Sequence, residues 1–317
     1  MVLKTTFKSK TNHKAVFAAT PANTVGKGIC MQNYVLMTDS SADLPLSLIE
    51  ELDIQVLQLN VTMEGEDSRP NDQVDVKAFY AALRQKKSAT TSTVSIESFL
   101  AAMEPILAAG KDILYLGFSS GLSGTYNAGF VAAKELSEKY PERKIYTVDT
   151  LCASLGEGLL VYTVAKMRQE GADLETVYRF AEDNKLHLCH WFTVDDLFFL
   201  KRGGRVSAAT AVMGSLLSIK PVMHVDNDGK LINVLKARGR KDAINQLFLK
   251  IRDTAIHVAE QTVFISHGDC LADAEYLADR IRNELSVKTV IVDYVGPVIG
   301  AHSGPGTLAL FFFGTQR

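Results

Sequence analysis

The chain has 317 residues, of which 47% are hydrophobic and 22% charged, and its formal net charge is −2. This composition is typical of a globular protein with about two domains of ordinary size. A nearly balanced charge gives no general attraction to nucleic acid or to an anionic membrane surface. No apolar run approaches the roughly 20 residues that a membrane-spanning helix needs.

The four cysteines are scattered, without a CxxC pair. This spacing favours neither a disulfide framework nor a zinc site, so a reducing, cytoplasmic location is expected. The cysteines are Cys30, Cys152, Cys189 and Cys270.

Residues 1–33 differ from the rest of the chain, because they contain lysines but no acidic residue and show only weak periodicity. They also lack the continuous apolar core of a signal peptide. We interpret them as a disordered basic leader, or as the product of an upstream start codon with Met31 as the working initiator. An amphipathic targeting segment is a further alternative. This segment is not counted in the predicted fold.

From residue 34 to about 170, short apolar runs alternate with helical periodicity. The apolar runs predict strands at 34–38, 54–59, 112–117 and 144–148, and the helical patterns predict helices at 74–84, 96–107 and 155–168, with others opening at Leu44 and after Thr125. Ser95 is expected to cap one helix and Gly110 to end it. Alternating elements with short connections predict an α/β domain over 34–170 with a doubly wound parallel sheet.

Beyond Gly171 this regular alternation changes. Helices are expected at 174–186, 240–257 and 271–285, and strands at 188–194, 219–225, 230–237, 262–266 and 289–292. Asp226-Asn-Asp-Gly229 is a hairpin signal between two of these strands. Residues 171–317 are therefore predicted to form an α+β domain with antiparallel pairs.

The stretch from Asp112 to Ala128 joins a buried strand to a helix through a loop rich in serine and glycine. Backbone N–H groups at a helix start attract an anion, and open parallel sheets bind ligands at the carboxyl ends of their strands. We therefore interpret this loop as the floor of an anion site. Its polar and small residues are Ser119, Ser120, Gly121, Ser123, Gly124 and Thr125.

Two other polar loops, Asp39-Ser-Ser41 and Thr90-Thr-Ser-Thr93, are expected on the same side of the sheet. Hydroxyl donors suffice to hold a carboxylate or a phosphate. A single serine or threonine more often caps a helix or completes a turn. Three such loops in one domain favour a ligand site, although the alternative that they only cap helices and complete turns stays open.

Gly117-Phe-Ser119-Ser-Gly121 matches the G-x-S-x-G elbow of serine hydrolases. Asp149 or Asp269, followed by His302, would complete a triad in the right chain order. Against this, Leu122-Ser-Gly124 prolongs the loop, so the tight strand–turn–helix geometry is lost. A serine hydrolase that uses Ser119 remains the enzymatic alternative, and a sugar- or phosphate-binding regulator is a third hypothesis.

Leu200-Lys-Arg-Gly-Gly-Arg205 could bind a phosphate or an acidic partner through its arginines, or could be a solvated basic turn. His302-Ser-Gly-Pro-Gly306 is expected to be a rigid turn, and His190 and His267 are expected to pack in or beside strands. The chain lacks a nucleotide-binding P-loop, an H-E-x-x-H motif and a spaced metal-ligand set. A binding protein is therefore favoured over an enzyme.

Six motifs, in this order, resemble those of the DegV family and cover the chain from Tyr34 to its end. They are Asp39-Ser-Ser-Ala-Asp-Leu-Pro45, Thr90-Thr-Ser92, Leu122-Ser-Gly-Thr-Tyr-Asn-Ala128, Val148-Asp-Thr150 with Ser154 and Gly156, Leu200-Lys-Arg-Gly-Gly-Arg205, and His302-Ser-Gly-Pro-Gly306. The resemblance implies a two-domain protein that holds a long-chain fatty acid in a tunnel between its domains. It also implies a subunit without its own catalytic machinery. Such a subunit presents the carboxylate to a separate ATP-dependent fatty acid kinase, which makes acyl phosphate for phospholipid synthesis.

The resemblance also implies roles for individual residues. Thr91, Ser92 and Ser123 would hydrogen-bond the carboxylate, and His302 would lie close to it. The supporting loop residues are Ser119, Ser120 and Gly124, and the partner-docking residues are Arg202 and, beside it, Arg205. No cofactor and no metal is implied.

One motif departs from the family pattern. Where the family usually has Thr-Ser-Gln-Pro-Ser, this chain has Thr91-Ser-Thr-Val-Ser95. The missing proline loosens the start of the following helix and could change how Ser92 is aimed.

Overall fold

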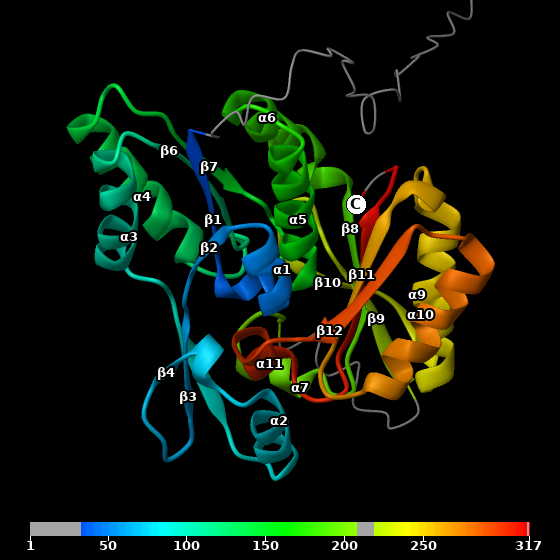
Figure 1. The fold of residues 1–317 in the computed structure, drawn as a ribbon. Helices are drawn as coiled ribbons and strands as arrows, with labels where there is room; N and C mark the ends of the chain where they lie inside the picture. The colour runs from blue at the N-terminus through cyan, green and yellow to red at the C-terminus, as the bar shows by residue number, and fades with distance from the viewer. Residues whose placement is uncertain (1–32, 208–218, 316) are drawn as a thin grey trace, which may run out of the picture. The chain divides into compact units, whose positions relative to one another are not determined.

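Three β-sheets are formed by residues 33–207, 219–315 and 317, which are the residues that the computed structural model describes (Figure 1). The predicted leader, apart from residue 33, and Met31 lie outside the described residues.

The first sheet is wholly parallel, with the strand order β2-β1-β6-β7. Its strands are β1 (Tyr34–Asp39), β2 (Ile54–Leu57), β6 (Asp112–Gly117) and β7 (Ile145–Asp149). Both faces are buried: Leu114 and Leu116 of β6 enter one hydrophobic core, whereas Ile113 and Tyr115 enter another. This alternation arises because successive side chains of a strand point to opposite faces.

Helices cover both faces of this parallel sheet (Figure 1). On one face lie α3 (Ile96–Ala108), capped by Ser95 as predicted, and α4 (Thr125–Lys139). On the other face lie α5 (Leu155–Gln169) and α6 (Leu174–Asn184). The predicted doubly wound arrangement is therefore confirmed.

A small antiparallel sheet was not predicted. It consists of β3 (Asn60–Met63), β4 (Arg69–Pro70) and β5 (Ala89–Ser92), and it lies near α2 (Val76–Arg84). Helix α1 (Leu46–Glu51) lies earlier in the chain, between β1 and β2. The prediction that residues 90–93 form a loop was wrong, because most of them belong to β5. Threonine favours strands, but a run of threonines gives no alternation of apolar and polar residues from which a strand could be recognised.

The third sheet has the strand order β10-β9-β8-β13-β11-β12. Only β11 and β12 are parallel neighbours among its described pairs, and the predicted hairpin at Asp226–Gly229 joins β9 to β10. The predicted class, a parallel sheet followed by a sheet with antiparallel pairs, is confirmed. The strands are β8 (Leu188–Thr193), β9 (Ile219–Val225), β10 (Leu231–Arg238), β11 (Thr262–His267), β12 (Thr289–Tyr294) and β13 (Leu308–Phe313).

Three elements of this part were missed in the sequence. Strand β13 is continuously apolar and lies inside the sheet, with its alternate residues in two different cores. The short helices α7 (Phe198–Arg202) and α11 (Pro297–Ser303) include the first residues of the predicted turns at Leu200–Arg205 and His302–Gly306. The later parts of both segments, residues 203–204 and 305–306, are turns as predicted. Helices of five and seven residues complete at most two turns, too few to show a clear periodicity.

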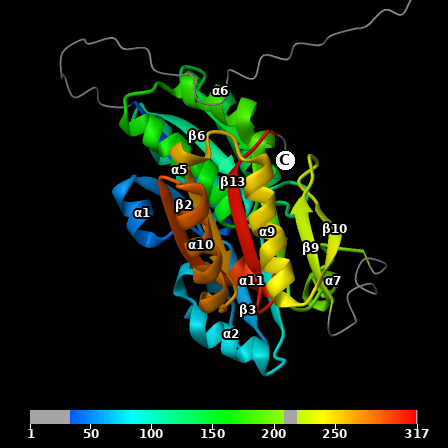
Figure 2. The same cartoon turned by 90° about the vertical axis from the view of Figure 1, so that its right-hand side faces the viewer.

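Helices α9 (Arg240–Thr254) and α10 (Leu271–Leu285) cover one face of the third sheet (Figure 2). Helix α5 packs against the other face as well as against the parallel sheet, so one hydrophobic core continues between the two sheets. Helix α5 is therefore in contact with both sheets.

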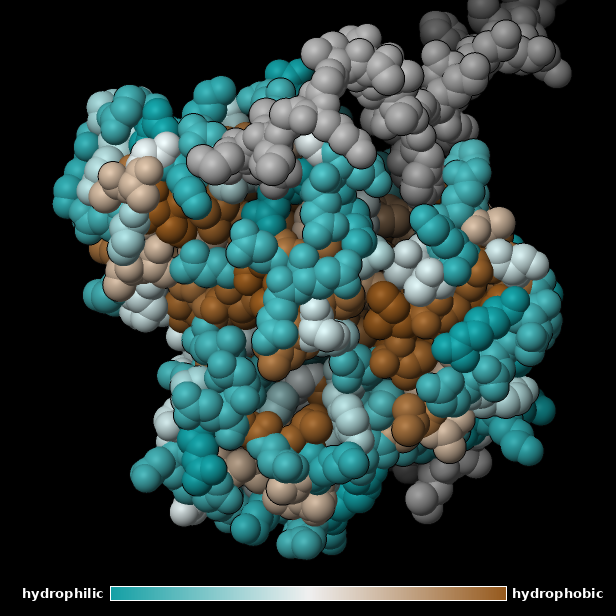
Figure 3. Space-filling model, in the orientation of Figure 1, coloured by the Kyte–Doolittle hydropathy of each residue, from teal (hydrophilic) through white to brown (hydrophobic). Residues whose placement is uncertain are grey.

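None of the described helices is long and apolar enough to cross a membrane. On the face drawn in Figure 3, apolar surface occurs in separate areas divided by hydrophilic residues. Exposed apolar side chains such as Leu46 of α1 and Phe198 of α7 lie on different elements. This dispersion is ordinary for a globular protein.

Candidate functional site

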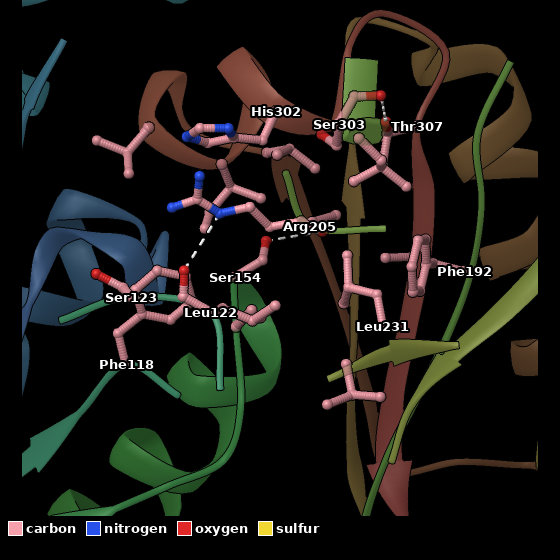
Figure 4. A pocket seen from close by; sticks show the side chains of 18 of the residues that line it. Phe118, Leu122, Ser123, Ser154, Phe192, Arg205, Leu231, His302, Ser303 and Thr307 are labelled. Carbon is pink, nitrogen blue, oxygen red and sulfur yellow. Dashed lines mark hydrogen bonds between the residues drawn. The ribbon is translucent and has the colours of Figure 1, made fainter. Parts of the chain in front are cut away.

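A cavity lies where β5, the loop after β6, α7, α11 and the inner face of the third sheet meet (Figure 4). Its empty volume is about 850 Å³, solvent at its mouth included. Most of the wall is apolar, including Leu59, Phe118, Phe192, Leu231, Val298 and Phe311.

The four residues predicted to bind a carboxylate all line this cavity. Thr91 and Ser92 come from β5, Ser123 from the loop before α4, and His302 from α11. The Oγ1 atom of Thr91 lies 2.8 Å from Nε2 of His302, which joins the small sheet to α11 across 211 residues of sequence. The fold thus gathers hydroxyl and imidazole groups from three distant segments.

His302 is neutral at physiological pH. Burial, assisted by the positive charges of Arg205 and Arg202, lowers its pKa to about 4. A neutral imidazole carries one N–H donor and one acceptor nitrogen. The positive charge beside these groups therefore comes from Arg205, whose pKa is lowered by burial but whose guanidinium stays protonated at neutral pH.

The two arginines predicted to dock a partner occupy different positions. Arg205 lines the cavity, and its Nε donates to the carbonyl oxygen of Leu122 at 3.2 Å (Figure 4). Arg202 is exposed on α7, with its guanidinium carbon 4.9 Å from the centre of the Phe199 ring. Arg205 is thus part of the wall, whereas Arg202 is on the surface.

The predicted supporting loop holds Ser123 in place. The N–H of Ser123 donates to the carbonyl oxygen of Ser119, and the N–H of Thr125 donates to Oγ of Ser123 at 3.2 Å. The N–H of Ser120 donates to Asp149, and Gly124 is the residue that precedes α4. The Ser123 hydroxyl also lies 3.0 Å from Oγ1 of Thr125, in a contact where either oxygen can donate. When Thr125 is the donor, the hydrogen of the Ser123 hydroxyl is available to a ligand.

The groups required for a Ser119 triad make other interactions. The Ser119 hydroxyl is fully buried and donates to the carbonyl oxygen of Gly229 at 2.8 Å. His302 bonds Thr91, Asp149 accepts from backbone N–H groups, and Asp269 pairs with Arg84. Within the described ranges, no cluster of His, Cys, Asp and Glu is suited to a metal ion.

Two residues of this site received no role from the sequence. Gly203 packs against the His302 ring so closely that a Cβ there would lie less than 3.0 Å from Nδ1. Ser154, at the start of α5, lines the cavity with φ = 54° and donates to Oδ2 of Asp43 at 2.6 Å. The Gly-Gly pair was a visible signal for Gly203, whereas the backbone strain at Ser154 has no sequence signature.

An apolar cavity with hydroxyl groups and a guanidinium in one part of its wall suits an amphipathic anion. The fold and the cavity thus define a mixed α/β protein with a candidate site for a small molecule. Residues 33–315 match the family model described as an uncharacterised protein family, DegV, and the chain belongs to this family.

Relatives match most of the chain. The DegV domain-containing protein CPE0026 of Clostridium perfringens is 47% identical over 289 residues, which are 90% of this chain and 99% of that protein. A DegV lipid-binding protein from Thermotoga maritima is 31% identical, with a TM-score of 0.79 over 90% of this chain and 100% of that one. A DegV family protein from Thermus thermophilus, reported for its fatty acid binding, is 30% identical, with a TM-score of 0.81 over 89% and 100%.

Proposed function

We propose that this protein binds a long-chain fatty acid, with the carboxylate among Thr91, Ser92, Ser123 and His302 and the acyl chain along the apolar wall. The observation that carries this proposal is that one cavity combines these polar groups with a mainly apolar lining. The fatty-acid and lipid binding reported for structural relatives supports it. Each buried methylene contributes about 0.8 kcal/mol, so the tail dominates the affinity and the polar groups set the orientation.

In the proposed complex, hydrogen bonds run from His302 through Thr91 to the ligand. When Nε2 of the neutral His302 carries the proton, it donates to Oγ1 of Thr91 over their 2.8 Å separation. The Thr91 hydroxyl then donates to the carboxylate. Arg205 supplies the compensating positive charge from the same wall.

The finer part of the proposal is that the protein is a cytoplasmic carrier subunit, not itself catalytic. It would present the bound carboxylate to a separate ATP-dependent kinase that forms acyl phosphate. The exposed Arg202 on α7, close enough to lower the His302 pKa, supports docking at this end of the cavity. Residues 34–170 and 171–317 would be the two domains between which the acyl chain lies.

Calorimetric titration of the delipidated full-length protein tests the proposal. An 18-carbon fatty acid should bind at one site per chain, and the alcohol of the same length should bind at least about tenfold more weakly, because it lacks the charge that the site recognises. Equal affinities would contradict the carboxylate site, and failure of both to bind would contradict lipid binding. Labelling by a fluorophosphonate that Ser119→Ala abolishes would instead support the hydrolase.

A further inference from the structure

A second group of polar side chains lines the same cavity, in addition to the residues proposed to bind the carboxylate. Ser154 comes from the start of α5, Ser266 from β11, Ser303 from the end of α11 and His190 from β8. All four are buried, the most exposed being Ser303 at 5%. An unsubstituted hydrocarbon chain cannot form hydrogen bonds with these groups.

The directions of the hydrogen bonds show what these serines can offer a ligand. Ser154 donates its one hydroxyl hydrogen to Asp43, at 2.6 Å. Above the Asp43 pKa of about 7 the ionised carboxylate can only accept, so Ser266 is then the donor in the 3.1 Å contact between the two serine hydroxyls. Both hydrogens are thus used within the protein, and the remaining lone pairs can act only as acceptors.

Two neighbouring groups lack hydrogen-bond partners within the described part of the chain, namely Oγ of Ser303 and Nε2 of His190. Native proteins leave few buried polar atoms unsatisfied, because an unpaired buried polar group destabilises the folded state. Burial holds the His190 pKa well below its ordinary value, so this imidazole is neutral and one of its ring nitrogens is an acceptor.

The backbone of Ser154 adds an independent observation. Its φ of 54° with ψ of −148° lies in a region that only glycine adopts easily. A non-glycine residue held in such a region strains the backbone and destabilises the folded state. The strained residue is Ser154, which lines the cavity and whose hydroxyl is hydrogen-bonded to both Asp43 and Ser266.

We propose that the preferred ligand is a hydroxy fatty acid, whose chain hydroxyl donates to the acceptor wall formed by Ser154 and Ser266. This inference rests on the proposed fatty-acid function and specifies its substrate class. The hydroxyl of the ligand can in turn accept a hydrogen bond from Ser303, which then gains a partner on ligand binding.

Competition binding to the delipidated full-length protein tests this inference. The probes are octadecanoic acid and hydroxyoctadecanoic acids whose hydroxyl is moved stepwise along the chain. One hydrogen bond to an otherwise unsatisfied site should make at least one isomer bind roughly three- to tenfold more tightly than octadecanoic acid. In Ser266→Ala the two affinities should differ by less than about twofold, and Ser303→Ala should reduce the ratio in the same direction.

Ser137→Ala is the matched control, because the Ser137 hydroxyl donates within α4 to Ala133 and does not line the cavity. This variant should keep the ratio of the wild type. If octadecanoic acid binds at least as tightly as every hydroxylated isomer, the inference is wrong and water satisfies these groups. If none of the acids binds, both the proposed fatty-acid binding and this inference are wrong. Failure of the inference alone is therefore distinguishable from failure of the proposed function.

Discussion

Gly203→Ala tests whether the position of His302 matters for ligand capture. The φ of Gly203 is −71°, which alanine adopts without strain, so the added methyl acts through space alone. Its Cβ would lie less than 3.0 Å from Nδ1 of His302, and ordinary contact begins at 3.4 Å. The ring must therefore move by several tenths of an ångström or more, away from the orientation that places Nε2 2.8 Å from Thr91.

The expected cost has two parts. Overpacking of this kind typically destabilises the fold by about 1–3 kcal/mol, which urea unfolding measures. Loss of one hydrogen bond in the carboxylate site, worth about 0.5–1.5 kcal/mol, should weaken fatty-acid binding by roughly two- to tenfold in a calorimetric titration. Thr91→Val should cause at least this loss of affinity without overpacking, because it removes both the bond to His302 and the hydroxyl proposed to donate to the carboxylate.

Gly124→Ala is the matched control for this substitution. Gly124 has a similar φ of −78°, but a Cβ there would lie 3.9 Å from its nearest neighbour, Cγ2 of Thr93. Its affinity should stay within about twofold of the wild type, since no atom has to move. Wild-type affinity in a folded Gly203→Ala variant, or in Thr91→Val, would refute a role for the Thr91–His302 pair in capture.

Three further predictions concern other parts of the site. Ser123→Ala should weaken fatty-acid binding by roughly two- to tenfold while the chain stays folded, and unchanged acyl retention would count against this residue. Arg202→Glu should abolish kinase-dependent acyl phosphate formation while lipid stays bound, and surviving turnover would remove the docking role. Burial raises the pKa of Asp43 from 3.8 to about 7. As the pH rises, the carboxyl group therefore loses its proton in the unfolded state before it does so in the folded state, and the wild type becomes less stable between pH 3.8 and 7. An asparagine side chain does not titrate, so the free energy of unfolding of Asp43→Asn, relative to that of the wild type, should rise by about 4 kcal/mol between pH 3.8 and 7. Urea unfolding that gives the same difference between the two proteins at both pH values would contradict this.

The long and regular elements could be predicted from the sequence. Strand β6, strand β9 and helix α10 have the predicted bounds, because each combines a clear apolar pattern with a terminal signal. Strand β5 and helix α11 could not be predicted in this way. Strand β5, Ala-Thr-Thr-Ser, has no alternation of apolar and polar residues, and helix α11 is too short to show a period. Both elements depend on packing with distant segments.

The candidate site shows the same division. The hydroxyl-rich segments 90–93 and 119–124 indicated an anion site from local sequence, and the family resemblance assigned the carboxylate to Thr91, Ser92, Ser123 and His302. Their contacts could not be predicted, because Thr91 and His302 are 211 residues apart. The approach of Gly203 to the His302 ring likewise depends on how α7 and α11 pack, which no local pattern encodes.

Denaturing extraction of the purified protein, followed by mass spectrometry of the released small molecules, tests the central claim most directly. The account predicts nearly one long-chain fatty acid per chain, and the same spectrum identifies its length, unsaturation and any hydroxyl group. A protein that releases no lipid and also fails to take up added fatty acid would contradict the account.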